Sequence, residues 1–304
     1  MALSIAIAGV HEQGLYIADT LTAAGHRCTL VTIDRALAEK NRASGWIDYR
    51  TQAEKRGLPL HHTTTYALKS PDDHAWFAAQ GFDAMVFGGW QRLVPGEVLS
   101  TLRFGCIGQH GSAEFLPRGR GRSPLNWSVI EGRQRLVWHL FQVTPGIDDG
   151  PILDWMDVDI LPWDDCETLY LKIGIVVKQM LVRTLAALEA GTLTPQPQIG
   201  PATHYGKRTP EDGRIDWSWP LLRIHNLIRA VTKPYPGAFA DGPDGRVVLW
   251  RAQPFDTRLA YPHALPGMVV EVFEDGRHLV NTVDGLLLVT EWEGTPPPLG
   301  ACYQ

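Results

Sequence analysis

The sequence predicts an α/β fold, in which a Rossmann-like, mostly parallel sheet is covered by helices and followed by a smaller C-terminal β domain. Short apolar runs alternate with helix-like segments over the first two thirds of the chain, which is typical of parallel strands joined by crossover helices. The last third holds short apolar runs bounded by Gly, Pro and Asp, as in a small all-β domain. The 304 residues, 44% hydrophobic and 20% charged, fit one large or two medium globular domains.

The predicted elements of the first domain follow in order along the chain. Residues 4–10 (SIAIAGV) form an apolar run, which predicts a buried first strand. Apolar residues at near-helical spacing then predict a helix from about Glu12 to Ala24. Further strands are expected at residues 26–33, 83–87, 105–107 and 136–143, and a long amphipathic helix is expected over residues 164–191.

A change of composition marks the predicted domain boundary. The stretch TLTPQPQIGPATHYG is rich in Pro, Thr and Gly, so we expect a linker over residues 191–206. The first domain then covers residues 1–190 and the second covers residues 207–304. Strands of the second domain are expected at residues 246–250, 268–272 and 285–290.

Bulk properties exclude several classes of protein. The N-terminal apolar run stops at His11, too early for a membrane span and without a cleavage pattern, so we expect a cytoplasmic protein without a membrane partner. The formal net charge of −5 disfavours a broad grip on nucleic acid. Four cysteines lack CxxC spacing and eleven histidines are scattered, so we expect free thiols and no metal site.

The chemistry is expected in residues 105–153. The strand GCI is followed at once by the polar residues Gln109, His110 and Ser112. Sites in open α/β sheets lie beyond the carboxyl ends of strands, so His110 is placed to act as a general base. Asp148, in the turn GIDDG after another predicted strand, could orient His110 and favour its protonated form. Taken alone, His110 is read equally well as structural, and Asp148 is better read as part of an ordinary Asp-Gly turn.

An arginine-rich loop lies between these two elements. The loop LPRGRGRSP contains three arginines, which are separated by single glycines: Arg118, Arg120 and Arg122. Such a loop either binds an anion or is exposed to solvent without a ligand. The following segment, PLNWSVI at residues 124–130, begins like a helix with Pro in its first turn.

Taken together, these blocks resemble the formyltransferases that use 10-formyltetrahydrofolate, a family that includes methionyl-tRNA formyltransferase, glycinamide ribonucleotide transformylase and the nucleotide amino-sugar formyltransferases. The family carries a strand ending in N-x-H-x-S, then LLP-x-x-RG-x-x-P, then G-x-D-x-G-x-I-L. This chain matches at His110, Ser112, Leu116, Pro117, Arg120, Gly121, Pro124, Gly146, Asp148, Gly150, Ile152 and Leu153. Residues 201–218 and the segment IRAVTKPYPGAF resemble the start of the family's C-terminal β-barrel (OB-like) domain.

The resemblance implies roles for the site residues. His110 is the base for the attacking amine and Asp148 is its orienting partner, while 10-formyltetrahydrofolate is the co-substrate. The family's Asn, two residues before the histidine, donates a hydrogen bond to the developing oxyanion, but this chain has Gly108 there. Replacement donors to consider are Gln109, the Gly108 backbone N–H, Asn126 and His139. A slipped alignment would put His110 at the Asn position and Ser112 at the His position, but the intact GCI argues against it.

The resemblance also implies binding residues for folate and acceptor. The segment FGGWQRLVP at residues 87–95 matches the segment that shapes the pterin pocket, which implicates Trp90, Arg92, Leu93 and Val94. Without the resemblance, Trp90 would be read as a core aromatic. The turn after the last strand would line the other side of the pterin through Thr144, Ile147 and Gly150. The acceptor would meet Arg118, Arg120, Arg122, Asn126 and His139.

The charge of the second domain bears on the acceptor. From Pro201 to Gln304 there are ten Lys and Arg against twelve Asp and Glu, whereas a domain that grips tRNA should be basic. We therefore expect a small amine acceptor, such as an amino-sugar nucleotide or a hydroxyornithine-type hydroxylamine. The alternatives are methionyl-tRNA formyltransferase, a 10-formyltetrahydrofolate hydrolase and a catalytically silent folate-binding protein. A dinucleotide-binding protein is a weaker alternative, because GVHEQG replaces G-x-G-x-x-G after the first strand. The sequence gives no oligomeric state.

Overall fold

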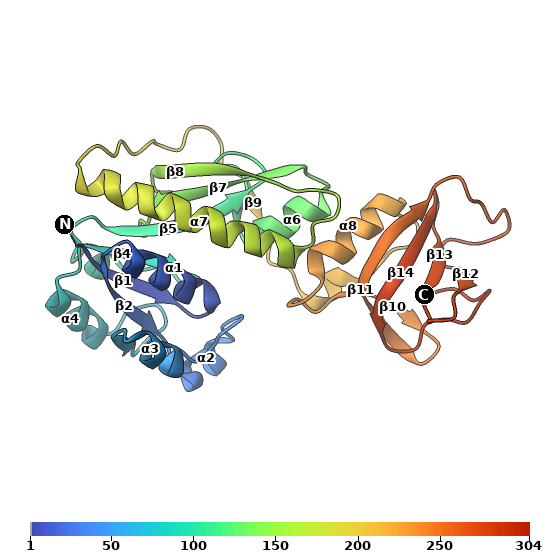
Figure 1. Cartoon of the computed structure of the whole chain (residues 1–304), viewed down its shortest axis with the longest axis horizontal. Coiled ribbons are helices and arrows are strands. Elements are labelled where there is room, and N and C mark those ends of the chain that lie inside the picture. The colour runs from blue at the N-terminus through green and yellow to red at the C-terminus, as the bar shows by residue number, and fades with distance from the viewer. Residues whose placement is uncertain (1) are drawn as a thin grey trace. The chain divides into compact units, whose positions relative to one another are not determined.

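A computed structural model describes residues 2–304 (Figure 1). By internal packing the chain divides into two units. Of the described residues, the first unit comprises residues 2–121, Val137–Asp157 and Lys172–Thr203, and the second comprises Arg122–Leu136, Val158–Leu171 and His204–Gln304. Two segments within the predicted first domain thus pack with the second unit, while the boundaries at 190 and 207 remain a prediction.

A seven-stranded sheet in the order β3-β2-β1-β4-β5-β7-β8 forms the centre of the N-terminal part. The neighbours from β3 to β5 pair in parallel, and β7 pairs with β5 in the antiparallel direction. The predicted α/β class with a mostly parallel sheet is therefore confirmed. The strands are β1 (Ser4–Gly9), β2 (Arg27–Thr32), β3 (Leu60–His62), β4 (Ala84–Gly88), β5 (Cys106–Ser112), β7 (Arg135–Gln142) and β8 (Ile152–Asp159).

Local sequence signals explain where many of the helices begin and end. The helix α4 is the clearest case: the Ser70 side chain accepts a hydrogen bond from the Asp73 N–H, Pro71 stands in the first turn, and Gly81 ends the helix at a φ of 62°. The helices are α1 (Glu12–Ala23), α2 (Arg35–Asn41), α3 (Arg50–Arg56), α4 (Pro71–Gln80), α5 (Gly96–Leu99), α6 (Pro124–Ile130), α7 (Cys166–Glu189) and α8 (Leu221–Val231).

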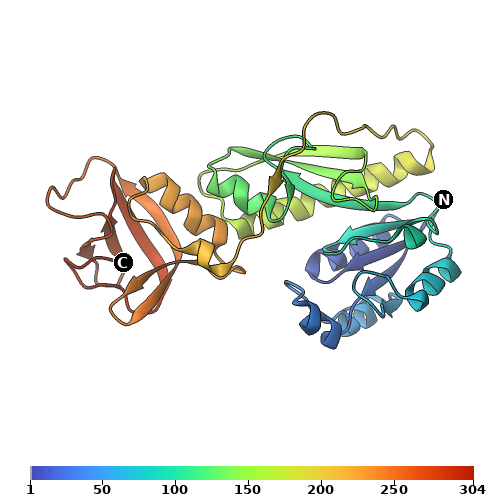
Figure 2. The ribbon, with the colours of Figure 1, turned by 180° about the vertical axis from the view of Figure 1, so that it is seen from behind.

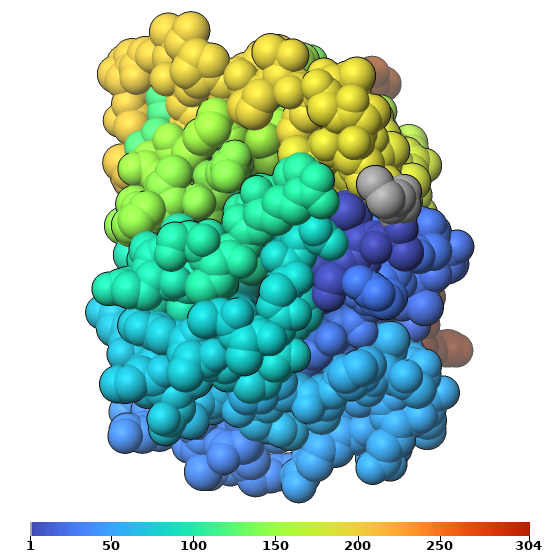
Figure 3. Space-filling model, turned by 90° about the vertical axis from the view of Figure 1, so that its left-hand side faces the viewer, coloured from blue at the N-terminus to red at the C-terminus, as the bar shows by residue number. Residues whose placement is uncertain are grey.

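Two of these helices lie beside each other in the first unit. The Lys178 ammonium of α7 lies 4.8 Å from the centroid of the Tyr16 ring of α1. Figure 3 shows the blue N-terminal residues packed directly against the yellow end of α7 on this face of the molecule. The two helices are therefore neighbours at this point, and α1 packs on β1, β2 and β4.

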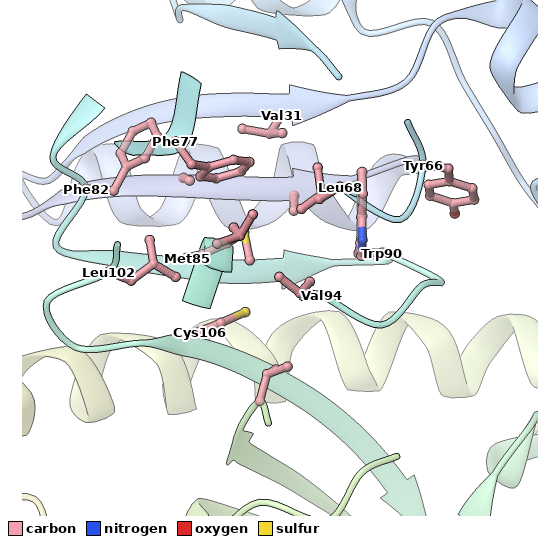
Figure 4. Close-up of a cluster of buried hydrophobic side chains, with 14 of the residues drawn as sticks. Val31, Tyr66, Leu68, Phe77, Phe82, Met85, Trp90, Val94, Leu102 and Cys106 are labelled. Carbon is pink, nitrogen blue, oxygen red and sulfur yellow. The ribbon is translucent and has the colours of Figure 1, made fainter. Parts of the chain in front are cut away.

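One core cluster lies on one side of the parallel strands. Figure 4 shows Phe77 and Phe82 from the α4 region beside Met85 of β4, with Trp90 and Val94 further along. All five side chains are buried. This packing fixes the loop after β4, from which the predicted pterin-binding residues come.

The second unit contains a five-stranded antiparallel sheet in the order β10-β11-β14-β13-β12 (Figure 2). The predicted strands at 246–250, 268–272 and 285–290 are confirmed within it. In this order β10 and β12 are the edge strands, whereas a closed barrel has no edge strand. Phe239 of β10 forms an isolated bridge with Arg214, and Met268, just before β12, forms one with Cys302. The strands are β10 (Ala238–Gly242), β11 (Gly245–Asp256), β12 (Val269–Val272), β13 (His278–Asn281) and β14 (Leu286–Glu293).

Short elements complete the chain: β6 (Arg120–Gly121), β9 (His204–Tyr205) and the 3-10 helix η1 (Pro210–Gly213). Across residues 2–304, none of the helices combines the length and the apolar character that crossing a membrane requires.

Candidate active site

His110 lies inside a strand, which corrects the expectation that the strand ends at residue 107. The strand β5 continues to Ser112 because β7 pairs with it in an unbroken antiparallel register. In this register Gly108 is opposite Phe141, and His110 is opposite His139. Since side chains alternate between the faces of a strand, Gly108, His110 and Ser112 share one face and Gln109 faces the other.

The hydrogen bonds of His110 define its tautomer. Its Nε2 lies 2.8 Å from the Gly119 carbonyl oxygen, which can only accept, so Nε2 carries the proton. Its Nδ1 lies 3.6 Å from Asp148 Oδ2. Nδ1 is therefore the atom that can take up a proton, and the facing carboxylate stabilises the charged ring that results. The predicted pair is thus brought together, with the imidazole buried and the carboxylate 24% exposed.

The turn that carries Asp148 is tightly constrained. Asp148 has a φ of 49°, a left-handed conformation that few residues other than Gly adopt and that costs about 1–3 kcal/mol. A side chain at Gly150 would place its Cβ 1.7 Å from the Gln142 carbonyl oxygen. Within the turn, the Thr144 hydroxyl donates to Asp149, and the Gly146 N–H donates to the Thr144 hydroxyl at 3.2 Å. The carboxylate therefore reaches His110 only because the surrounding chain holds this conformation.

Gly108 is opposite two apolar side chains that leave no room for a donor. A Cβ at this position would lie 2.7 Å from Phe141 Cζ and 2.9 Å from Val143 Cγ2. Both distances are well below an ordinary carbon–carbon contact of roughly 3.5–4.0 Å. The volume that an asparagine side chain would need is therefore filled by a phenylalanine ring and a valine methyl group.

Gln109 is engaged on the opposite face of the strand from His110. Its Nε2 donates to the Phe87 carbonyl oxygen at 2.6 Å. Its Oε1 accepts from Gln13 Nε2 at 3.0 Å and from Trp138 Nε1 at 3.2 Å. The prediction that Gln109 belongs to the catalytic group is therefore not supported by the geometry, because strand alternation turns its side chain away.

His139 and Asn126 are likewise committed elsewhere. His139 Nδ1 contacts the His110 carbonyl oxygen at 3.3 Å, and its Nε2 accepts from the Leu116 N–H at 3.4 Å. Burial lowers the pKa of His139 to about 4, so the ring is neutral with both nitrogens used. Asn126 is buried in the second unit, where its Nδ2 donates to the Ala230 carbonyl oxygen at 2.6 Å.

Ser112 holds the loop after β5. Its hydroxyl donates to the Arg118 carbonyl oxygen at 2.8 Å and accepts from the Glu114 N–H at 3.3 Å. The same loop brings Phe115 edge-on to the His139 ring, with the ring centroids 4.7 Å apart, and to Trp155 of β8 at 5.3 Å. Phe115 and Trp155 are 41% and 42% exposed. Nothing in the sequence pattern predicted this aromatic pair. Phe115 contacts His139, which is the residue opposite His110 in the register of β5 and β7.

The predicted pterin segment divides into buried and exposed residues. Trp90 is buried and packs edge-on against Tyr66 at 4.9 Å, and Val94 is buried beside it (Figure 4). The indole N–H of Trp90 has no hydrogen-bond acceptor among residues 2–304. Arg92 lies over the Tyr66 ring at 4.5 Å, while Leu93 and Ile147 are 48% and 55% exposed.

The three loop arginines have different surroundings. Arg118 forms an exposed ion pair with Glu114 at 3.6 Å. The Arg120 guanidinium donates to Gln198 Oε1. Arg122 packs with the second unit.

Comparison with protein families supports these assignments of fold. Residues 36–185 match the family model described as formyl transferase, and residues 207–295 match the model described as formyl transferase, C-terminal domain. The methionyl-tRNA formyltransferase of Solibacter usitatus is 33% identical over 204 residues, which are 67% of this chain and 64% of that protein. The enzyme of the same name from Thermodesulfovibrio yellowstonii is 31% identical over 198 residues, 65% of this chain and 61% of that protein. The matched part of the chain thus spans somewhat less than two thirds of either relative.

Solved structures with the same fold are more distant in sequence. HypX from Aquifex aeolicus in complex with tetrahydrofolic acid aligns with a TM-score of 0.69 at 17% identity, over 96% of this chain and 44% of that one. An N-formyltransferase from Helicobacter canadensis, in complex with folinic acid and dTDP-3-aminofucose, aligns with a TM-score of 0.68 at 14% identity, over 96% of this chain and 100% of that one. With two domain models in order along the chain and the same fold in these structures, the chain belongs to the formyltransferase family.

Proposed function

We propose that this chain transfers a formyl group from 10-formyltetrahydrofolate to the nitrogen of a small acceptor. The observation that carries the proposal is the His110–Asp148 pair, in which Nδ1 is the proton-accepting atom. The acceptor nitrogen attacks the formyl carbon and its proton passes to Nδ1, while Asp148 balances the charge. As the bond between the formyl carbon and N10 of the folate breaks, N10 takes this proton from Nδ1, and tetrahydrofolate leaves.

The loop after β4 supports folate as the formyl donor. The buried indole N–H of Trp90 lacks a protein acceptor, and a polar atom of a bound pterin would satisfy it. Leu93 and Ile147 are exposed apolar residues on the two segments that the resemblance assigns to the pterin, and a bound ring would cover them. Among the solved structures with this fold, HypX is in complex with tetrahydrofolic acid, and the Helicobacter canadensis N-formyltransferase is in complex with folinic acid.

The surroundings of Gly108 support a strongly nucleophilic acceptor. Phe141 fills the space of the missing donor, and Gln109, His139 and Asn126 are all bonded elsewhere. Because loss of one oxyanion donor typically costs about 10²–10³ in rate, a nitrogen of high nucleophilicity, such as that of a hydroxylamine, is favoured. The Helicobacter canadensis structure contains an amino-sugar nucleotide.

Charge supports a small acceptor over tRNA, because residues 201–304 contain more acidic than basic side chains. On an amino-sugar nucleotide, Arg118 and Arg120 are the proposed contacts for phosphate. The specific observation in favour of methionyl-tRNA formyltransferase is the 33% identity to an enzyme of that name, together with the matched C-terminal domain. It is therefore the second candidate.

The decisive experiment measures release of tetrahydrofolate by purified protein with 10-formyltetrahydrofolate and a panel of acceptors. The panel contains dTDP-amino sugars, δ-N-hydroxyornithine and initiator methionyl-tRNA, with a reaction lacking any acceptor. Turnover with a small nitrogen nucleophile supports the proposal. Turnover with methionyl-tRNA alone refutes the small acceptor, and turnover without an acceptor identifies a hydrolase. Folate binding without turnover under any condition identifies a silent binding protein.

A further inference from the structure

The segment after α7, predicted as a linker, runs back along the sheet and binds it. Figures 1 and 2 show this segment beside β8 in both views. The Gln196 N–H donates to the Ile152 carbonyl oxygen at 2.8 Å, and the Ile152 N–H donates to the Gln196 carbonyl oxygen at 2.7 Å. We call residues 196–203 the strap. Its main chain is thus fixed to the strand that follows the Asp148 turn.

Gln198 of the strap binds two main-chain carbonyl groups of the Asp148 turn. Its Nε2 donates to the Asp148 carbonyl oxygen at 2.7 Å and to the Gly150 carbonyl oxygen at 2.8 Å. Its Oε1 accepts from Arg120 Nε at 3.2 Å and from Arg120 Nη2 at 2.6 Å. Every polar atom of this amide is therefore occupied, and none of these bonds uses the Asp148 carboxylate.

The strap also holds the loop that binds His110. The Thr203 hydroxyl accepts from the Gly119 N–H at 2.8 Å, and the Thr203 carbonyl oxygen accepts from the Arg120 N–H at 2.9 Å. Gly119 is the residue whose carbonyl oxygen accepts from His110 Nε2. One short segment therefore fixes the partner of each ring nitrogen, the Gly119 carbonyl at Nε2 and the Asp148 turn at Nδ1.

We propose that Gln198 is a positioning residue for the His110–Asp148 pair. Asp148 adopts a strained φ, and a strained residue keeps its conformation only where its surroundings over-determine it. Gln198 supplies that constraint through the two carbonyl groups, and it leaves the carboxylate free to face Nδ1. The effect of Gln198 on catalysis rests on the proposed function, whereas its effect on the distance between His110 and Asp148 does not.

Three variants of the full chain separate the contributions. Gln198→Met keeps the length of the side chain and removes all four hydrogen bonds. Gln198→Glu keeps the acceptor for Arg120 and loses the donors to the two carbonyl groups. Gln196→Ala is the matched control, since Gln196 is exposed, lies two residues earlier in the chain and binds β8 through its main chain.

The kinetic readout is the split between kcat and the acceptor KM. We expect kcat to fall about tenfold in both Gln198 variants, which is about 1.4 kcal/mol and the order of one or two hydrogen bonds. In Gln198→Glu, in which Arg120 keeps its acceptor, the acceptor KM should stay within about twofold, because an interaction that orients the base acts in the transition state. Gln196→Ala should match the wild type. A loss in Gln198→Met but not in Gln198→Glu would assign the effect to Arg120 and overturn the proposal.

A second readout does not depend on activity. The ¹⁵N NMR signals of the His110 ring nitrogens report the groups that face them, which are the Asp148 carboxylate at Nδ1 and the Gly119 carbonyl at Nε2. We expect the Nδ1 signal, recorded at one fixed pH, to change in Gln198→Met and not in Gln196→Ala, because the carboxylate that faces Nδ1 is displaced. Identical signals in Gln198→Met and the wild type would overturn the proposal. A wild type without formyl transfer would instead refute the proposed function, and this readout would still decide the role of Gln198.

Discussion

Replacing Gly108 with alanine should destabilise the protein, because the added methyl group has no space. Its Cβ would lie 2.7 Å from Phe141 Cζ and 2.9 Å from Val143 Cγ2, inside a strand that is buried and paired on both sides. Overpacking of this kind in a core costs typically about 1–3 kcal/mol. We therefore expect Gly108→Ala to lower the free energy of unfolding by that amount, as measured by urea denaturation.

The source of this cost can be isolated with a double-mutant cycle. Phe141→Ala alone should cost about 3–5 kcal/mol, because it leaves a cavity beside Gly108. In the double variant the new methyl group occupies part of that cavity and no longer meets the ring. We expect the double variant to be more stable than the sum of the single effects predicts, by about 1–3 kcal/mol.

Gly174→Ala is the control for the generic effect of replacing glycine. Gly174 is in the interior of α7, and an added Cβ there would have no heavy atom within 4 Å outside the neighbouring backbone of its own helix. Alanine should therefore stabilise the helix by about 0.5–1 kcal/mol. If Gly108→Ala is as stable as the wild type, or if its effect adds to that of Phe141→Ala, then the ring does not exclude a side chain here. The explanation for the missing asparagine would fail with it.

Three further predictions concern the site. His110→Ala should lower kcat by about 10²–10⁴ if the ring is the base, and Asp148→Asn should lower it less, since only the charge facing Nδ1 is lost; equal rates for wild type and His110→Ala would remove the catalytic assignment. Trp155→Ala should raise the acceptor KM about 2- to 10-fold at unchanged kcat if the Phe115–Trp155 pair contacts the acceptor, and an unchanged KM would exclude that contact. His139 has a folded-state pKa of about 4, below the unfolded value of 6.5, so its contribution to stability is complete above pH 6.5 and is lost as the pH falls towards 4. The loss is about 3 kcal/mol, and the free energy of unfolding of His139→Leu should lack this part of the pH dependence.

The regular elements of the first domain could be predicted because their patterns are local. The apolar run at 4–10 and the helical spacing after it correspond to β1 and α1, and the period-two pattern at 136–143 corresponds to β7. The helix α8 was missed although its sequence, LLRIHNLIRAV, has a clear apolar face. A window scan for helical periodicity would have found it.

The extension of β5 could not be predicted from local pattern. The residues GQHGS have neither the β-branched side chains nor the alternation of a strand, and their conformation is imposed by pairing with β7. The same pairing decides that Gln109 faces away from His110 and that Phe141 lies opposite Gly108. The identity of the candidate pair could be predicted from the family motif, whereas the direction of Gln109 and the filled space at Gly108 required the register.

The strap shows why a linker-like composition misled the sequence analysis. Pro195 and Pro197 flank Gln196, and a proline has no N–H to donate to a ladder. Pairing with β8 is therefore limited to one residue, which is the isolated bridge between Gln196 and Ile152. Proline also holds itself and the preceding residue in extended conformations. The bridge thus fixes which residue of the strap lies beside Ile152, and the stiff chain after it places Gln198 at the Asp148 turn. The prolines that suggested a flexible linker are therefore the residues that hold the strap in one conformation.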